Sequence, residues 1–306
     1  MYIPPRIPAA PGWGFRLILH PFAASAMVSV DSVTQSDLPP PVEPRLRRVA
    51  RQRKMASFRS IVALVLREMS STYGRTPGGY AWAILEPVAG IALLSFAFSV
   101  MFRDPPLGIS FPLFYASGML PFTAFSAVNA RVAQSLGYSR PLLAYPSVTF
   151  VDAILARFTL NFLTELMVAY LVFAGIIFFL DTRVILDFTS LALAFALTGA
   201  LALGVGTLNC FLTTAFPLWQ QVWSILMRPM FLLSGVMFTY DSIPAPIRDW
   251  FWYNPLIHVV GLTRRGVYAS YDAPYVSAAY VLAVAGICGL AGLLLLRRYH
   301  RLILQR

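Results

Sequence analysis

Charge is scarce in this chain. Only 12% of its 306 residues are Asp, Glu, Lys or Arg, whereas 58% are hydrophobic. A soluble globule of this size needs a larger polar surface. The stretch from Phe188 to Met227 has no charged residue at all, and about 20 apolar residues suffice to cross a bilayer once. The sequence therefore predicts a membrane protein, with two of its spans meeting near Pro217.

Lysine is almost missing, because 23 of the 24 basic residues are arginine. A P-loop needs a lysine directly after a glycine-rich turn, where it contacts the nucleotide phosphates. The single lysine, Lys54, instead follows Arg51, Gln52 and Arg53. The chain cannot be its own P-loop ATPase.

Histidine is also rare, and His20, His258 and His300 lie far apart in the sequence. No HExxH motif, paired-cysteine spacing or GxSxG motif is present, so a metal hydrolase or a nucleophile-elbow hydrolase has little support. A membrane-embedded glycosyltransferase or phosphatase could use only Asp241, Asp249 and His258, which lack catalytic spacing. No metal or cofactor site is expected in this chain.

The first 54 residues differ in composition from the rest. They are rich in proline and arginine and lack helical periodicity, which is typical of disordered segments. We expect residues 1–54 to be a disordered cytoplasmic extension and residues 55–306 to form the transmembrane domain.

An amphipathic helix is predicted over residues 57–73. Its apolar positions follow the i, i+3, i+4, i+7 pattern and are Phe58, Ile61, Val62, Val65, Leu66, Met69 and Tyr73. The basic cluster just before it favours a position in the membrane surface, and the alternative is an ordinary buried amphipathic helix.

Six spanning helices are predicted. They are placed at about Tyr80–Met101, Phe111–Ala130, Phe158–Leu180, Phe188–Phe216, Leu218–Tyr240 and Tyr275–Leu296. From residue 45 onward, sixteen basic residues lie before the first span, after the second and after the last, whereas the opposite side holds five, accompanied by six acids. Positively charged segments stay in the cytoplasm, so both termini are expected there.

Several motifs resemble those of one family of transporters. They are LLAYPSVTFVDAILAR at 142–157, LREM at 66–69 with YGR at 73–75, GYAWAILEP at 79–87, RP at 228–229 with LSGVMF at 233–238, and NPLIH at 254–258. Together they are similar to the membrane subunit of ABC-2 type exporters of capsular polysaccharide, in order and spacing over roughly residues 57–300.

The resemblance implies an all-α permease that works as a homodimer in the bacterial inner membrane. Two separate cytoplasmic ABC ATPase subunits would bind ATP and Mg. The cargo would be an acidic, lipid-linked polysaccharide, passed on to periplasmic and outer-membrane capsule export proteins. Nucleic acid is not an expected partner, since the net charge of +11 suits lipid headgroups and topology.

The resemblance also implies functional segments. A short cytoplasmic helix after the second span would contact the ATPase through Arg140, Pro141, Tyr145 and Pro146, although a plain polar connector would have the same composition. The surface helix corresponds to the family's gate helix, with Arg59, Arg67, Glu68 and Tyr73. Short re-entrant periplasmic helices are implied between spans five and six.

A glycan conduit needs aromatic rings for stacking and some polarity. The candidates are Phe122, Phe125, Trp219, Trp223, Arg228, Phe231, Phe238, Trp250, Trp252 and Tyr253. Most such residues pack or face lipid, and the last three equally suit an interfacial aromatic belt.

Two charges are predicted to lie inside the membrane, Glu165 and Arg228. Buried charge is costly there, so each needs a partner or a wet cavity. Either the two form an ion pair, or Arg228 faces an acidic glycan.

Three other functions stay open at this point. The same architecture could carry O-antigen, teichoic acid, another glycolipid or a drug. A membrane-embedded enzyme and a passive scaffold or channel belong to different classes.

Overall fold

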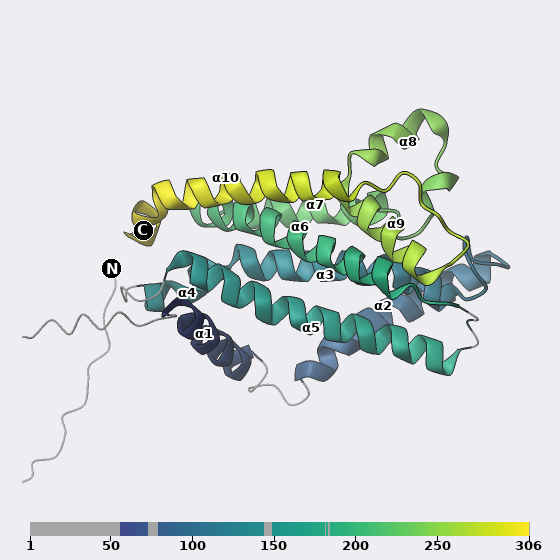
Figure 1. The fold of residues 1–306 in the computed structure, drawn as a ribbon, viewed down its shortest axis with the longest axis horizontal. Coiled ribbons are helices and arrows are strands. Elements are labelled where there is room, and N and C mark those ends of the chain that lie inside the picture. The colour runs from purple at the N-terminus through teal and green to yellow at the C-terminus, as the bar shows by residue number, and fades with distance from the viewer. Residues whose placement is uncertain (1–55, 73–78, 144–148, 181, 183, 306) are drawn as a thin grey trace, which may run out of the picture. The chain divides into compact units, whose positions relative to one another are not determined.

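The computed structural model describes residues 56–72, 79–143, 149–180, 182 and 184–305. These residues form helices and no strand (Figure 1). The helices are α1 Ala56–Thr72, α2 Gly79–Met101, α3 Phe111–Ala133, α4 Ser135–Leu143, α5 Phe150–Phe179, α6 Phe188–Ala215, α7 Trp219–Leu233, the 3-10 helix η1 Tyr240–Ser242, α8 Ala245–Trp252, α9 Pro255–Val267 and α10 Ala278–Gln305. The all-α class is confirmed, and the extension predicted over 1–54 lies outside the described residues.

Five of the described helices are long and apolar enough to cross a membrane, namely α2, α3, α5, α6 and α10. Three of them, α2, α3 and α6, begin and end close to the predicted spans. Helix α10 continues to Gln305 instead of ending at Leu296, and α5 begins at Phe150 instead of Phe158. A capping box explains the earlier start, because the Thr149 side chain accepts from the backbone N–H of Asp152 at 3.2 Å while the Asp152 carboxylate accepts from the backbone N–H of Thr149 at 3.0 Å.

The predicted fifth span, Leu218–Tyr240, forms a shorter helix. At about 1.5 Å per residue, the 15 residues of α7 extend only about 22 Å, less than a hydrocarbon core of about 30 Å. The helix ends where Ser234 precedes Gly235, whose φ of +73° a residue with a side chain adopts only under strain. An irregular segment then leads to η1.

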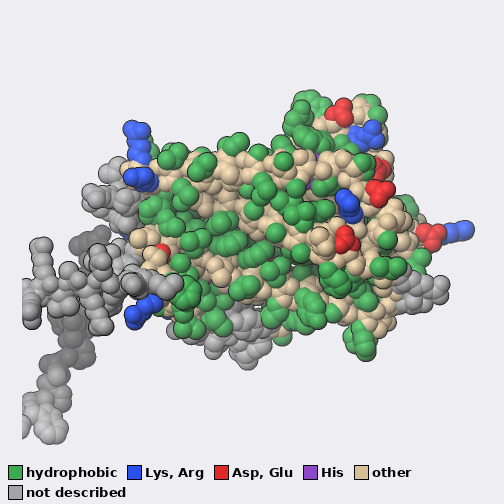
Figure 2. Space-filling model, viewed as in Figure 1, with side chains coloured by type: hydrophobic (Ala, Val, Ile, Leu, Met, Phe, Trp, Pro, Cys, Tyr) green, Lys and Arg blue, Asp and Glu red, His purple; other side chains and the backbone are tan. Residues whose placement is uncertain are grey.

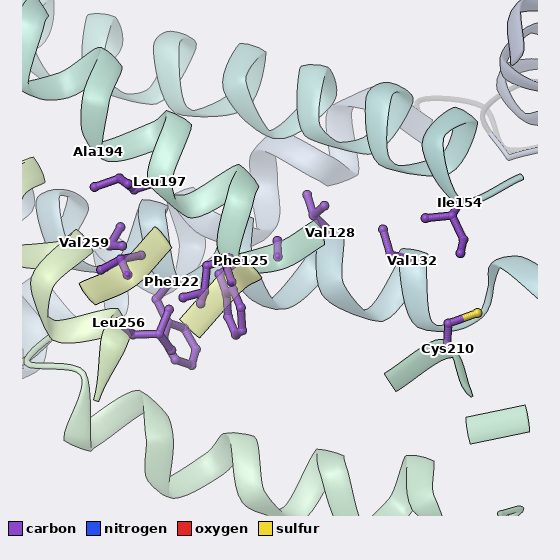
Figure 3. Packing of buried hydrophobic residues seen from close by; sticks show 14 of the residues in the cluster. Phe122, Phe125, Val128, Val132, Ile154, Ala194, Leu197, Cys210, Leu256 and Val259 are labelled. Carbon is purple, nitrogen blue, oxygen red and sulfur yellow. The ribbon is translucent and has the colours of Figure 1, made fainter. Parts of the chain in front are cut away.

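Helices α3 and α6 form the centre of the bundle. They bury 67% and 56% of their most apolar stretches, against 17% for α2 and 22% for α5 and α10. Figure 3 shows Phe122, Phe125 and Val128 of α3 among Leu197 of α6 and Leu256 of α9 in one cluster. The most buried of these five helices, α3, is also the least apolar by composition, a difference that the span prediction did not use.

Helices α6 and α10 run parallel and very close together. A methyl group at Gly204 would collide with the backbone of Ala285, and one at Gly292 would collide with the backbone at Thr207 and Leu208. Glycine is therefore required for the contact, as in other close helix pairs in membranes.

The two ends of the bundle differ in charge. In Figure 1, α1, α4 and the last turns of α10 lie at one end, here termed the α4 end, and α8 and α9 lie at the other, the α9 end. Figure 2 shows hydrophobic side chains covering the middle, while most acidic side chains in view lie near the α9 end. This distribution agrees with helices whose axes all cross the bilayer between the same two ends of the bundle.

The apolar stripe of α1 faces away from the protein. Phe58 and Leu66 are each 60% exposed, whereas Leu64 and Glu68 are buried against the bundle. Within this chain α1 therefore leaves most of its apolar stripe uncovered, unlike an ordinary buried amphipathic helix, and its position in the membrane surface stays a prediction.

Candidate functional site

Helix α4 occupies the position predicted for a coupling helix, between α3 and α5. Ser135, Leu136 and Ser139 are buried, and the Ser135 hydroxyl lies 3.4 Å from the Cys210 sulfur of α6. The opposite face exposes Gly137, Tyr138, Arg140 and Pro141. Of the predicted coupling residues, Arg140 and Pro141 thus share an exposed face at the α4 end, and Tyr145 and Pro146 lie outside the described residues.

Helix α1, the predicted gate helix, is attached to α5 by a buried ion pair. Arg157 Nε donates to Glu68 Oε1 at 2.9 Å, with both side chains at most 5% exposed. Asn161 Nδ2 contacts the same carboxylate oxygen at 3.5 Å and donates to the carbonyl of Arg157 at 2.8 Å. Arg59 is exposed, and Tyr73 lies outside the described residues.

Tyr138 joins α4 to the same ion pair. The guanidinium carbon of Arg157 lies over its ring at 4.3 Å from the centroid, and that of Arg67 at 4.9 Å. The sequence analysis missed this contact. The signal was available in part, because an arginine in the first turns of a span needs an anionic or aromatic partner.

A first cavity of about 540 Å³ opens between α2, α3 and α5. We call it the acidic cavity, because Glu86 and Glu165 line it together with Arg131, Trp82 and Phe122. The Glu165 carboxyl group interacts electrostatically with the charged groups of Glu86 and Arg131. Glu165 therefore faces a polar hollow, as predicted for a charge at this depth.

Arg228 does not meet Glu165. It is exposed on α7, and the ion pairs formed by the described residues do not include one between these two side chains. The pairing predicted from membrane depth alone is not formed, because depth does not fix the direction in which two helices turn their side chains.

A second cavity of about 280 Å³ lies between α3, α6 and α7. We call it the amide pocket. Its polar lining residues carry no charge and are Ser126, Gln134, Asn209, Thr213, Gln220 and Ser224, with Trp223 as the aromatic one. Amides and hydroxyls beside an indole ring match the hydroxyls and apolar faces of a sugar.

A hydrogen-bond chain fixes the wall of the amide pocket. Trp219 Nε1 donates to Asn209 Oδ1 at 2.9 Å, and Asn209 Nδ2 donates to Asn129 Oδ1 at 3.2 Å. These two hydrogen bonds connect the start of α7 to α6 and α3. Trp219 is thus held by a partner within the protein.

The other aromatic candidates do not gather in one place. Phe125 is 3% exposed and packs in the core. Phe122 and Phe231 meet edge to face at 5.2 Å, on the side of α3 that faces α7. Phe238 contacts Phe251 near the α9 end.

The aromatic residues of α8 divide between the surface and the interior. Trp250 and Tyr253 are 78% and 66% exposed, which suits an interfacial belt or an exit. Trp252 is half-buried, and its Nε1 donates to the carbonyl of Tyr275 at 3.2 Å.

His258 is a structural residue. It is fully buried, its Nε2 lies 2.8 Å from the carbonyl of Trp252, and its Nδ1 accepts from the backbone N–H of Ser277 at 3.2 Å. Burial lowers the pKa of the ring, against the opposing effect of the Trp252 hydrogen bond. With both nitrogens engaged by backbone, His258 cannot serve the enzyme set that includes Asp241 and Asp249.

Arg264 lies in the last turn of α9 and is a buried charge. It is 1% exposed, and its two terminal nitrogens donate to the carbonyls of Phe238 at 2.6 Å and Val236 at 3.0 Å. Its guanidinium also lies over the Phe114 ring at 4.3 Å. Arg264 thus holds the segment after α7 against α9 and α3.

A further hollow in the described part of the chain is apolar. It measures about 1000 Å³ and lies between α5 and α6, lined by residues such as Phe162, Phe173 and Phe195. In a bilayer it faces acyl chains and offers a glycan little polarity, so we do not assign it to the substrate.

The chain is similar to known transport proteins. The model of a family described as ABC-2 type transporter matches residues 59–268. The polysialic acid transport protein KpsM of Escherichia coli is 34% identical over 239 residues, which are 78% of this chain and 92% of that protein.

Two further relatives are more distant. The capsule polysaccharide export inner-membrane protein CtrC of Neisseria meningitidis serogroup B is 23% identical over 243 residues, 79% of this chain and 92% of its own. The capsule polysaccharide export inner-membrane protein BexB of Haemophilus influenzae is 22% identical over 244 residues, with the same coverage.

Proposed function

Because this chain belongs to the ABC-2 type transporter family, we propose that it is the membrane permease of an ATP-driven exporter of capsular polysaccharide. One observation carries the proposal: relatives named for polysialic acid transport and capsule polysaccharide export align with it over 92% of their length. The permease resides in a bacterial inner membrane and moves its cargo from cytoplasm to periplasm.

Two copies of a separate ABC ATPase supply the energy and bind ATP and Mg. They dock at the α4 end, where the exposed face of α4 offers Arg140 and Pro141. The absence of a P-loop lysine from the sequence requires such a partner. Periplasmic and outer-membrane capsule export proteins receive the glycan.

The chain crosses the membrane six times with both termini in the cytoplasm. The fifth crossing consists of α7 and the irregular segment up to Tyr240, which together connect the α4 end to the α9 end (Figure 1). Helices α8 and α9 then lie on the periplasmic side and partly re-enter the bilayer. Non-helical backbone is tolerable at depth when protein covers it, and Arg264 supplies such cover by binding two of its carbonyls.

The permease works as a homodimer whose conduit runs along α7. Gln220, Ser224 and Arg228 recur every four residues on this helix, with Gln221 beside them, and all are exposed. A polar stripe of this kind is costly against lipid. It suits a water-filled path bordered by a second copy.

The amide pocket is the first sugar-binding position on this path. It adjoins the stripe, because Gln220 and Ser224 belong to both. Trp223 stacks on an apolar sugar face, the amides bind hydroxyls, and Arg228 attracts the acidic groups of the glycan. If the cargo were an uncharged O-antigen, teichoic acid or another glycolipid, Arg228 would contribute less to its binding.

The test uses the tagged permease with the P-loop ATPase that copurifies with it, reconstituted in nanodiscs. We expect acidic capsular polysaccharide to stimulate ATP hydrolysis, and neutral glycan of equal length to do so less. Stimulation by O-antigen or teichoic acid alone would reassign the cargo. ATP hydrolysis by the purified permease without any partner would overturn the proposal.

A further inference from the structure

Three helices meet at one junction near the α4 end, and the proposed function assigns no role to this junction. The junction consists of Glu68 and Arg67 from α1, Tyr138 from α4 and Arg157 from α5. It is the point at which a helix exposed to the cytoplasm touches both the gate helix and a span.

The two contacts of Arg157 differ in kind. Its Nε–Glu68 Oε1 hydrogen bond of 2.9 Å is charged, buried and directional, so α1 and α5 hold one geometry there. Its contact with the Tyr138 ring depends on distance to the π face and has no single required direction. The Tyr138 ring can therefore keep α4 attached to the locked α1–α5 pair over a range of ring orientations.

Tyr138 is also placed to receive an outside force. It lies on the exposed face of α4, with 36% of its surface accessible, whereas Ser135, Leu136 and Ser139 on the opposite face are buried. A movement of α4 carries the Tyr138 ring with it, and that ring contacts two guanidinium groups.

We propose that Tyr138 is a coupling residue, whose ring passes a displacement of α4 through Arg157 and Glu68 to the gate helix α1. This inference rests on the proposed function, because the displacement comes from the partner ATPase. It assigns a role to a residue outside the predicted coupling set of Arg140, Pro141, Tyr145 and Pro146.

The test compares Tyr138→Leu, which removes the π face, with Tyr138→Phe, which keeps it. Both are made in the intact permease–ATPase complex in nanodiscs, with polysaccharide-stimulated and basal ATP hydrolysis measured separately. We expect Tyr138→Leu to keep basal hydrolysis and to reduce the stimulated component about tenfold, the effect of losing a partly desolvated cation–π contact. Tyr138→Phe should retain the stimulation.

A second readout separates coupling from simple stability. Nitroxide labels at Arg59 of α1 and Gly137 of α4, both exposed, report the distance between the helices with and without a non-hydrolysable ATP analogue. In the unsubstituted junction the two labels should move together and keep their distance. In Tyr138→Leu the distance should change on adding nucleotide, because α4 moves without α1.

The outcomes are distinguishable. If the unsubstituted complex shows no stimulation by polysaccharide, the proposed function fails. If stimulation is present and Tyr138→Leu keeps both the stimulation and the fixed label distance, the coupling role is refuted. Should Tyr138→Leu not assemble, Arg67→Gln leaves the Glu68–Arg157 pair in place and should lower stimulation partway, and normal stimulation in that variant would also refute the role.

Discussion

The buried ion pair between Glu68 and Arg157 allows a prediction with a definite size. Removing one partner of such a pair leaves an uncompensated charge and costs about 3–5 kcal/mol. For Glu68→Gln we expect the lower end, about 3 kcal/mol, because the Tyr138 ring remains against the Arg157 guanidinium.

The loss should appear locally. Helix α1 packs mainly against α5, so the variant is expected to free α1 while the spans stay folded. A local cost of about 3 kcal/mol corresponds to an exchange of α1 backbone amides that is about 100-fold faster. Hydrogen–deuterium exchange of the purified permease in nanodiscs measures this directly, with amides of α3 as the internal reference.

A double variant provides the control. Glu68→Leu with Arg157→Met removes both charges and keeps apolar volume, and such replacements are often neutral or stabilising. The double variant should restore slow exchange in α1. Exchange of α1 that is unchanged in Glu68→Gln, or no better in the double variant than in the single one, would refute the assignment of the pair as the attachment of α1.

Three other perturbations follow from the same structure. Gly204→Ala should destabilise the permease by about 1–3 kcal/mol, since the methyl group meets the backbone of Ala285; the melting temperature should fall, whereas Gly286→Ala, which enters open space, should leave it unchanged. Trp223→Ala should lower polysaccharide export about tenfold in a capsule assay while Trp223→Phe keeps most of it, and equal losses would contradict stacking. Arg264→Lys should cost about 2 kcal/mol in thermal unfolding, because an ammonium lacks the planar fork that reaches two carbonyls, and an unchanged melting temperature would contradict that role.

The long helices could be predicted from the sequence because apolar runs of span length have few alternatives in a folded chain. The apolar stripe of α1 was also readable, and its outward direction fits the membrane surface. The start of α5 could have been placed correctly as well, since Thr149 and Asp152 form a capping box with the usual spacing. The end of α7 at Ser234-Gly235 was not predicted, because three apolar residues on each side of this pair made the apolar run look continuous.

Side-chain partners were much less predictable. An ion pair between Glu165 and Arg228 was one of two alternatives predicted from their similar depth, yet Glu165 shares a cavity with Glu86 and Arg131. Which faces of two helices meet depends on their rotation about their axes, and hydropathy does not encode rotation. For the same reason the burial of Arg264 among backbone carbonyls could not be predicted from the sequence.

One turn of α3 borders two cavities of the protein. Ser126 and Ala130 line both the acidic cavity and the amide pocket, so this turn is a shared partition only one helix thick. A sideways displacement of this turn would therefore widen one cavity and narrow the other.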